Sequence, residues 1–257
     1  MASHRMCTED FSLPAAHGFD FPEGEHGILL LHGFTACPAQ LYPLGVGLRD
    51  AGFAVRAICL PGHGKTPRDM AASNWRDWLD AARSAARDMR SRYPLFTVAG
   101  LSMGGVLSLI LAEEMDVDAC VTLAAPMKAA NPFACIAPYL YFCYPTVHSR
   151  ENPAREQLDA RYDLGYVNYP TKKVGDLNTL IRMARKNLNK VRCPLLSIQS
   201  HRDTAIVPES LDVIQQGASS AVKAQLWLSD APHVITLSPE LPEILEKMTA
   251  FLRAVPN

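Results

Sequence analysis

The sequence predicts an α/β fold with a mostly parallel, doubly wound sheet that helices cover on both faces. Short apolar runs alternate six times with longer segments of helical periodicity. Several runs are apolar at nearly every position, which is typical of parallel strands buried on both faces. The 257 residues are 48% hydrophobic and 20% charged, so the chain can bury a large core as one domain with an insertion.

This alternation gives each element a position. The apolar runs predicted as strands are residues 27–32, 53–59, 95–99, 119–123, 194–199 and 222–228. The predicted helices are residues 38–51, 74–92, 103–115, 176–190, 208–216 and 239–254. In the helix at 176–190, an apolar stripe that contains Leu177 and Ile181 lies opposite Arg185, as in a helix that packs on a core.

About fifty residues, 126–175, interrupt the alternation, where an α/β connection usually takes only a few. We therefore expect a core of residues 1–125 and 176–257 and a cap of residues 126–175. The first half of the cap, NPFACIAPYLYFCYP, is apolar and aromatic, and the second half is polar. The cap is either a helical excursion on the sheet edge or a lid over a pocket, and we favour the lid because long ordered loops are usually functional. The side chains that can line one face of a short helix there are Phe133, Ile136, Tyr139, Leu140 and Phe142.

Charge and hydropathy argue against several classes of protein. The 25 Lys and Arg residues nearly balance the 26 Asp and Glu residues and form no dense basic block, so we expect no nucleic-acid partner. The N-terminus lacks the apolar core of a signal peptide, and no later run approaches the roughly 18 apolar residues of a membrane span. We therefore expect a cytoplasmic protein without stable membrane insertion.

The seven cysteines are odd in number, scattered, and never form the C-x-x-C pairs of zinc or redox sites. Most are expected to be reduced and buried, where they behave as small apolar residues. Cys135 and Cys143 form the only close pair, and their setting is aromatic rather than electropositive. Neither a metal nor an organic cofactor is implied.

Gly100-Leu101-Ser102-Met103-Gly104 fits the G-x-S-x-G pattern of a nucleophile elbow. The run at 95–99 precedes it and the helix at 103–115 follows, which is the strand-turn-helix setting that the motif requires. In so tight a turn the serine adopts a strained backbone conformation, and side chains at 100 and 104 would collide. We therefore predict Ser102 as a nucleophile above the sheet, at a helix N-terminus that favours negative charge.

A serine nucleophile needs a general base, and the base needs an orienting acid. Asp203 follows the strand at 194–199 and His233 follows the strand at 222–228, so both are expected at the same sheet edge as Ser102. Two other acids compete with Asp203. Asp212 lies inside a predicted helix, and Asp230 lies on the loop of the histidine itself, where local turn bonding suits it better.

Among the histidines, His233 has the chain order and the position that a base requires. His201 adjoins Asp203 but precedes it in the same loop, which makes a line of three groups unfavourable. His32 and His63 lie in loops at strand ends, where imidazole commonly holds a loop by bonding backbone groups. The remaining histidines are His148, in the cap, and His4, His17 and His26, which precede the first predicted strand and are expected to be solvated.

An oxyanion hole would complete the site, because fixed N–H donors stabilise the negative oxygen of a tetrahedral intermediate. One predicted donor is the backbone N–H of Met103, which follows the nucleophile. The second is the backbone N–H of Phe34, in the loop after the first strand, where Gly33 allows the turn. The Phe34 ring is also a candidate wall of an acyl pocket.

These segments together resemble the α/β-hydrolase superfamily, and more narrowly the small bacterial carboxylesterases that include monoacylglycerol lipases. The shared motifs are LLLHGFT, PGHG, AGLSMGG and HVITL, with Asp203 as the acid between the last two. The resemblance implies an α/β-hydrolase fold and a serine hydrolase that cleaves carboxylic esters through an acyl-enzyme. Its substrates would be short- to medium-chain esters or monoacylglycerols. Ala36 departs from the family, which often has glycine there, so we expect a shifted or stiffer oxyanion loop if that glycine has a positive φ.

Other functions remain open at this point. A thioesterase or a perhydrolase would use the same three side chains for acyl transfer. A ligand-binding protein of the same fold is disfavoured, because it has little need for Ser102, Asp203 and His233 together. The sequence predicts a small-molecule ester as the partner and gives no oligomeric state.

Overall fold

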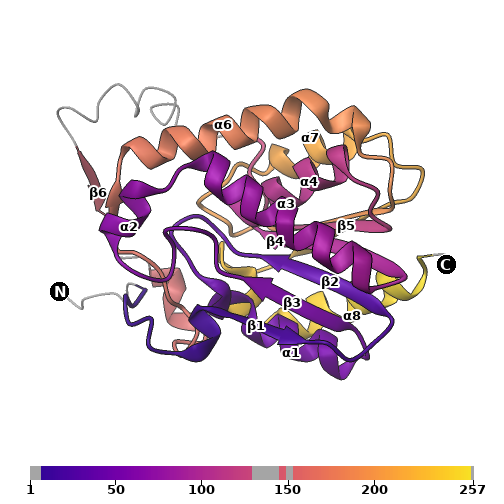
Figure 1. Cartoon of the computed structure of the whole chain (residues 1–257), viewed down its shortest axis with the longest axis horizontal. Helices are drawn as coiled ribbons and strands as arrows, with labels where there is room; N and C mark the ends of the chain where they lie inside the picture. Colours follow the sequence, from indigo (N-terminus) through magenta and orange to yellow (C-terminus); the bar gives the residue numbers. More distant parts are fainter. Residues whose placement is uncertain (1–6, 129–144, 149–152, 256–257) are drawn as a thin grey trace.

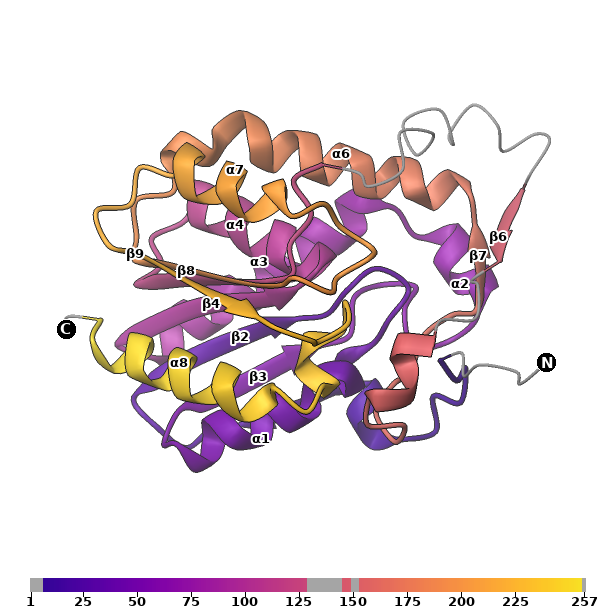
Figure 2. The ribbon, with the colours of Figure 1, turned by 180° about the vertical axis from the view of Figure 1, so that it is seen from behind.

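The computed structural model describes residues 7–128, 145–148 and 153–255. Its centre is a seven-stranded sheet in the order β1-β3-β2-β4-β5-β8-β9, of which Figure 1 labels β1 to β5 and Figure 2 labels β8 and β9. The strands are β1 (Gly18–Phe21), β2 (His26–Leu31), β3 (Ala54–Ile58), β4 (Leu95–Leu101), β5 (Ala119–Leu123), β8 (Leu195–Ser200) and β9 (Lys223–Leu228). Neighbouring strands are parallel except for β1, which pairs antiparallel with β3 at the edge. The predicted fold class is confirmed.

Helices cover both faces of this sheet (Figures 1 and 2). One face carries α3 (Trp75–Arg92), α4 (Met103–Glu114), α6 (Lys172–Asn187) and α7 (Glu209–Gly217), and the other carries α1 (Tyr42–Asp50) and α8 (Leu241–Arg253). The shorter helices are η1 (Pro14–Ala16), η2 (Pro38–Leu41), α2 (Pro67–Ala72), η4 (Pro153–Gln157), η5 (Leu188–Lys190) and η6 (Ile235–Leu237). No helix in the described ranges is both long enough and apolar enough to cross a bilayer.

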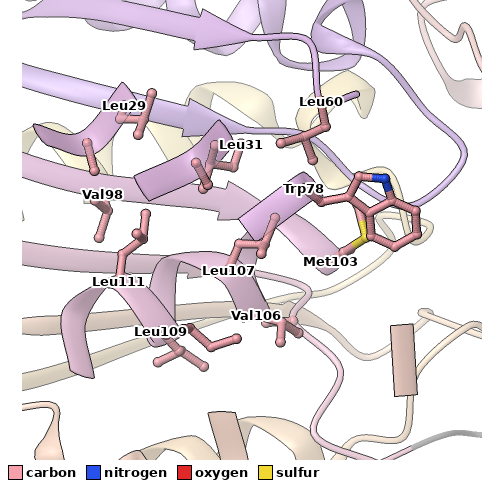
Figure 3. Close-up of a cluster of buried hydrophobic side chains, with 14 of the residues drawn as sticks. Leu29, Leu31, Leu60, Trp78, Val98, Met103, Val106, Leu107, Leu109 and Leu111 are labelled. Carbon is pink, nitrogen blue, oxygen red and sulfur yellow. The ribbon is translucent and has the colours of Figure 1, made fainter. Parts of the chain in front are cut away.

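Two apolar cores lie on opposite faces of the sheet, because successive strand residues point to opposite sides. On β2, Leu29 and Leu31 belong to the core beneath α3 and α4, whereas Ile28 and Leu30 belong to the core beneath α1 and α8. Figure 3 shows the first core, where side chains of β2, β4, α3 and α4 meet. Helix α4 is apolar on nearly all sides, and it is buried between the sheet and α6.

The helix boundaries follow local sequence signals. Helix α3 begins with a capping box, in which Asn74 accepts from the Arg76 amide and Asp77 accepts from the Asn74 amide. Helix α6 begins at Lys172, four residues before the predicted start. The sequence prediction starts this helix only after Gly175. A glycine inside a helix costs only about 1 kcal/mol, so Gly175 does not interrupt α6.

Two features before the first predicted strand were misread. The edge strand β1 was missed, because Gly18–Phe21 is too short to show a clear alternation. His26 was expected to be solvated but is buried, because it is the first residue of β2, and its Nε2 lies 2.7 Å from Thr97 Oγ1 on the neighbouring strand. His17 is exposed, as predicted, and His4 lies outside the described residues.

The described parts of the predicted cap contain η4 and two short strands, β6 (Thr146–His148) and β7 (Asn168–Pro170), which pair antiparallel. The apolar segment with Phe133, Ile136, Tyr139, Leu140 and Phe142 lies outside the described residues, as do Cys135 and Cys143. The return segment of the cap contacts the N-terminal segment, where Thr8 bridges to Leu164. The division into core and cap therefore stays a prediction.

Helix α4 also carries a half-buried acid, Glu113, whose titration should be measurable. Burial, and then the neighbouring Glu114, raise the pKa of Glu113 from 4.5 to about 8, and its Oε1 has no hydrogen-bond partner within the described residues. Between pH 4.5 and about 8, the Glu113 carboxyl group binds more protons in the folded state than in the unfolded state. The free energy of unfolding therefore decreases as the pH rises through this range. Glu113→Gln should remove this loss and gain stability over the natural chain as the pH rises from about 5 to 8.

Urea unfolding at several pH values measures this difference. Glu243→Gln is the matched control, because it removes one exposed carboxylate from α8, on the opposite face of the sheet, and should give no such gain. An unchanged pH dependence in Glu113→Gln would contradict the assignment.

Candidate active site

Ser102 lies between the end of β4 and the start of α4, with φ 54° and ψ −117°. This conformation is strained for a residue with a side chain, and it persists only where the surroundings impose it. A Cβ at Gly100 would collide with the Gly104 backbone, and one at Gly104 would collide with the Leu31 carbonyl group. The two glycines therefore allow α4 to begin directly against β2, which places the Ser102 hydroxyl above the sheet edge.

The three predicted side chains meet at this edge. His233 Nε2 lies 2.9 Å from Ser102 Oγ, and His233 Nδ1 lies 2.7 Å from Asp203 Oδ2. The Asp203 side chain is fully buried, and its other oxygen accepts from the amides of Ala205 and Ile206 at 2.8 and 3.2 Å. These bonds fix the carboxylate, so it can orient the imidazole toward the serine.

The competing residues lie elsewhere. Asp212 is in the first turn of α7, and the exposed Asp230 pairs with Arg202 at 3.5 Å. His201 stacks on Trp227, with ring centroids 4.6 Å apart, on the exposed side of its loop. None of the three lines the cavity beside Ser102.

His32 and His63 hold loops around the site, as the sequence predicts. His32 Nδ1 donates to the Gly33 carbonyl at 2.9 Å, while Nε2 accepts from the Leu60 amide at 3.0 Å. His63 Nδ1 donates to the Pro61 carbonyl at 3.2 Å. Burial lowers the pKa of His32 to about 4, and burial together with the nearby His32 lowers the pKa of His63 to about 3. Both rings are therefore neutral at neutral pH.

The loop after β2 presents Phe34 beside the serine. Gly33 packs against Ser102, since a Cβ built on Gly33 would lie 3.4 Å from the serine Cβ. The Phe34 amide has no protein acceptor within the part of the chain that the structure describes. The Met103 amide opens α4, where first-turn amides lack partners inside the helix. Both predicted donors thus flank the nucleophile.

The departure at Ala36 does not strain this loop. Among its non-glycine residues the positive φ is at Thr35, at 65°, and not at Ala36. The Ala36 amide donates to the Gly33 carbonyl at 3.2 Å and closes a turn. A shifted or stiffer loop is expected only if position 36 has a positive φ. Ala36 does not have one, so this expectation does not apply.

A cavity of about 390 Å³ opens onto Ser102 and His233. Helix α6 contributes three apolar side chains to the lining, all from one face of the helix: Val174, Leu177 and Ile181. Phe34 lines the same region, and its ring centroid lies 5.3 Å from that of Tyr169. Most of this region belongs to the core beneath α3, α4 and α6, so it forms a largely apolar end of the cavity, in which Asn178 of α6 is a polar member.

The other end of the cavity is polar. Arg155, on η4, and Gln40, on η2, both line it and both bond the buried Asp163. The Arg155 Nη1 atom lies 2.6 Å from one carboxylate oxygen, and Gln40 Nε2 donates at 3.2 Å. Helix η4 lies near the His233 loop, since Gln157 Nε2 donates to the Asp230 carbonyl at 3.2 Å. Sequence reasoning missed this end, because nothing in the pattern links residue 40 to residue 155.

Within the described residues, no three His, Cys, Asp or Glu side chains lie close enough together to hold a metal ion. The five described cysteines, Cys7, Cys37, Cys59, Cys120 and Cys193, are free. Burial raises the pKa of Cys37 and Cys193 to about 12, so these thiols stay protonated.

The model of the alpha/beta hydrolase family matches residues 28–249, which include the elbow, the acid and the histidine. The chain belongs to the alpha/beta hydrolase family. Its sequence is 32% identical to a thermostable monoacylglycerol lipase of Bacillus sp. (strain H-257), over 93% of this chain and 95% of the lipase. It is 27% identical to a carboxylesterase of Bacillus subtilis, over 91% and 95% of the two chains.

Solved structures agree with this assignment. A structure from work on LipS and LipT, two metagenome-derived lipolytic enzymes, superposes with a TM-score of 0.87 at 30% identity. It covers 94% of this chain, and this chain covers 98% of it. The protein is thus an ester hydrolase of this family, as the sequence resemblance implied.

The elbow makes a direct prediction for Gly104. In Gly104→Ala the new methyl group meets the Leu31 backbone, which cannot move without displacing β2, so the variant should lose several kcal/mol of stability or fail to fold. Gly47→Ala, in α1, is the matched control, because the three atoms nearest to its methyl group all belong to the flexible Leu245 side chain and not to backbone. Thermal unfolding measures both, and equal melting temperatures for the two variants would refute the argument.

Proposed function

We propose that Ser102, His233 and Asp203 are the catalytic residues of an ester hydrolysis that proceeds through an acyl-enzyme. The observation that supports this most is the hydrogen-bonded line from Asp203 through His233 to Ser102, which opens into the cavity. Ser102 Oγ attacks the ester carbonyl while His233 Nε2 takes its proton. The same imidazole then returns the proton to the alcohol that leaves. A water molecule repeats both steps on the acyl-enzyme and releases the acid.

The tetrahedral oxygen formed in each step needs fixed donors. We assign this role to the backbone amides of Phe34 and Met103, which flank Ser102 from the β2 loop and from the start of α4. Asp203 holds the imidazole with Nδ1 protonated and stabilises the imidazolium when Nε2 accepts the serine proton. This chemistry needs no metal or organic cofactor.

The two ends of the cavity suggest how an ester binds. The acyl chain would lie against the apolar face of α6, with Val174, Leu177 and Ile181 around it. The alcohol would lie toward Gln40 and Arg155, whose polar groups suit hydroxyl groups. This orientation fits short- to medium-chain esters and monoacylglycerols, in keeping with the lipase activity named for the Bacillus relative.

In this assignment the cap, residues 126–175, contributes to the substrate site, since Arg155, Tyr169 and Val174 come from it. A thioesterase or a perhydrolase would use the same three side chains, and a panel of thioester and peracid assays separates these activities from ester hydrolysis. A cytoplasmic location and the absence of a nucleic-acid partner remain predictions from the sequence.

The nucleophile and the base can be tested with a fluorophosphonate probe and p-nitrophenyl esters. Ser102→Ala should abolish both labelling and hydrolysis while the protein stays folded. His233→Ala should lose roughly 10³-fold or more in kcat, whereas His201→Ala should keep most activity, because its ring stacks on Trp227 away from the cavity. Labelling at another serine, or a larger loss in His201→Ala than in His233→Ala, would overturn the assignment.

The acyl site can be tested with a series of esters of increasing chain length. Each buried methylene contributes about 0.8 kcal/mol, so kcat/KM should rise about three- to fourfold per added carbon until the apolar end is full. Leu177→Trp should fill that end and move the optimum to shorter chains while acetate esters are still cleaved.

The matched control is Arg185→Trp, which adds the same ring to the exposed face of α6 and should leave the profile unchanged. If Leu177→Trp also keeps the original profile, the acyl chain does not bind along α6.

A further inference from the structure

The loop that carries His233 joins the last residue of β9, Leu228, to η6. Residues 229–232 lie outside every helix and strand, so the sheet cannot supply acceptors for their backbone amides. The His233 ring near the end of this loop nevertheless lies within hydrogen-bonding distance of both Asp203, at 2.7 Å, and Ser102, at 2.9 Å. Contacts from outside the loop must therefore help to fix its backbone.

One carboxylate accepts hydrogen bonds from three successive amides of this loop. Glu240 lies 2.9 Å from the Ser229 nitrogen, 3.1 Å from that of Asp230 and 2.5 Å from that of Ala231. Within the described residues, no other hydrogen bond is donated by a backbone amide of residues 229–233. Bonds to an ionised acceptor are roughly twice as strong as bonds between neutral groups, so this carboxylate dominates the backbone bonding of the loop.

The backbone of Glu240 is itself held by a rigid helix. Glu240 immediately precedes α8, and its carbonyl accepts from the Ile244 amide at 3.3 Å. Its amide donates to Ser238 Oγ at 3.3 Å. Helix α8 is anchored in the second core through the buried Ile244, Met248 and Leu252. The side chain of Glu240 thus ties the loop to an element that cannot shift without disturbing the core.

We propose that Glu240 is a positioning residue for ester hydrolysis, whose carboxylate holds the loop at 229–231 so that the His233 ring stays in line with Ser102 and Asp203. The proposal rests on the catalytic roles proposed above. Glu240 does not line the cavity, so it acts through His233 and not on the substrate. The loop has other polar contacts, since Gln157 Nε2 donates to the Asp230 carbonyl at 3.2 Å and the exposed Arg202 pairs with the Asp230 side chain at 3.5 Å, but neither contact binds a backbone amide of the loop.

The variant that tests this is Glu240→Gln, which keeps the shape but replaces one acceptor oxygen with a donor. At least one of the three amides then loses its acceptor and the loop is free to shift. A displacement of about 1 Å can cost as much as 10²-fold in rate, so kcat for p-nitrophenyl acetate should fall about 10- to 100-fold with KM within twofold. The far-downfield proton resonance of His233 Nδ1, which reports its bond to Asp203, should weaken.

The matched control is Glu243→Gln, which removes the same charge from the exposed first turn of α8 without touching the loop and should behave as the natural chain. If Glu240→Gln fails to fold, Glu240→Asp decides, because it keeps the charge but draws the carboxylate back by one methylene. Its kcat should then fall by a smaller factor.

A double variant separates positioning from general destabilisation. If Glu240 acts through His233, then Glu240→Gln should not lower the residual rate of His233→Ala any further. A lower melting temperature with an unchanged kcat and an unchanged proton resonance would overturn the proposal and leave Glu240 a purely structural role. Labelling of Ser102 in the natural chain is measured in parallel, so failure of the proposed function is recognised separately from failure of this inference.

Discussion

The close approach of α4 to β2 at the elbow is the constraint on which the site depends. It requires glycine at 100 and 104, and it forces Ser102 into a backbone conformation with φ 54° that residues with side chains rarely adopt. The sheet on one side and the buried helix on the other supply the packing that maintains this strain. This conformation places the Ser102 hydroxyl group above the sheet edge, next to the N-terminus of α4, where negative charge is favoured.

The other parts of the site reach the serine from separate loops, and each loop has its own support. Two backbone amides hold the Asp203 carboxylate, the neutral ring of His32 links the β2 loop to Leu60, and Glu240 gathers the amides before His233. Rigid support of this kind is expected where bond geometry must be kept within fractions of an ångström.

Local patterns made much of this arrangement predictable. The apolar runs located six of the seven strands of the central sheet, and the elbow motif together with chain order identified the three side chains that the structure brings into hydrogen-bonding distance. Features set by tertiary contact were not predictable. The polar end of the cavity joins Gln40 to Arg155 across 115 positions, and the burial of His26 follows from one residue of strand extension. The role proposed for Glu240 depends on hydrogen bonds between its side chain, just before α8, and the amides of the preceding loop. Such a contact does not affect the hydrophobic periodicity of the sequence.

The most direct test of the account is a crystal structure of the protein after reaction with a p-nitrophenyl phosphonate, whose tetrahedral phosphorus stands in for the carbon attacked in the ester. The account predicts phosphorus bonded to Ser102 Oγ, with the phosphoryl oxygen about 2.7–3.1 Å from the amide nitrogens of both Phe34 and Met103. It also predicts that His233 Nε2 stays within hydrogen-bonding distance of the ester oxygen that remains on phosphorus after p-nitrophenolate has left. Phosphorus on another residue, or a phosphoryl oxygen that points away from both amides, would contradict the account.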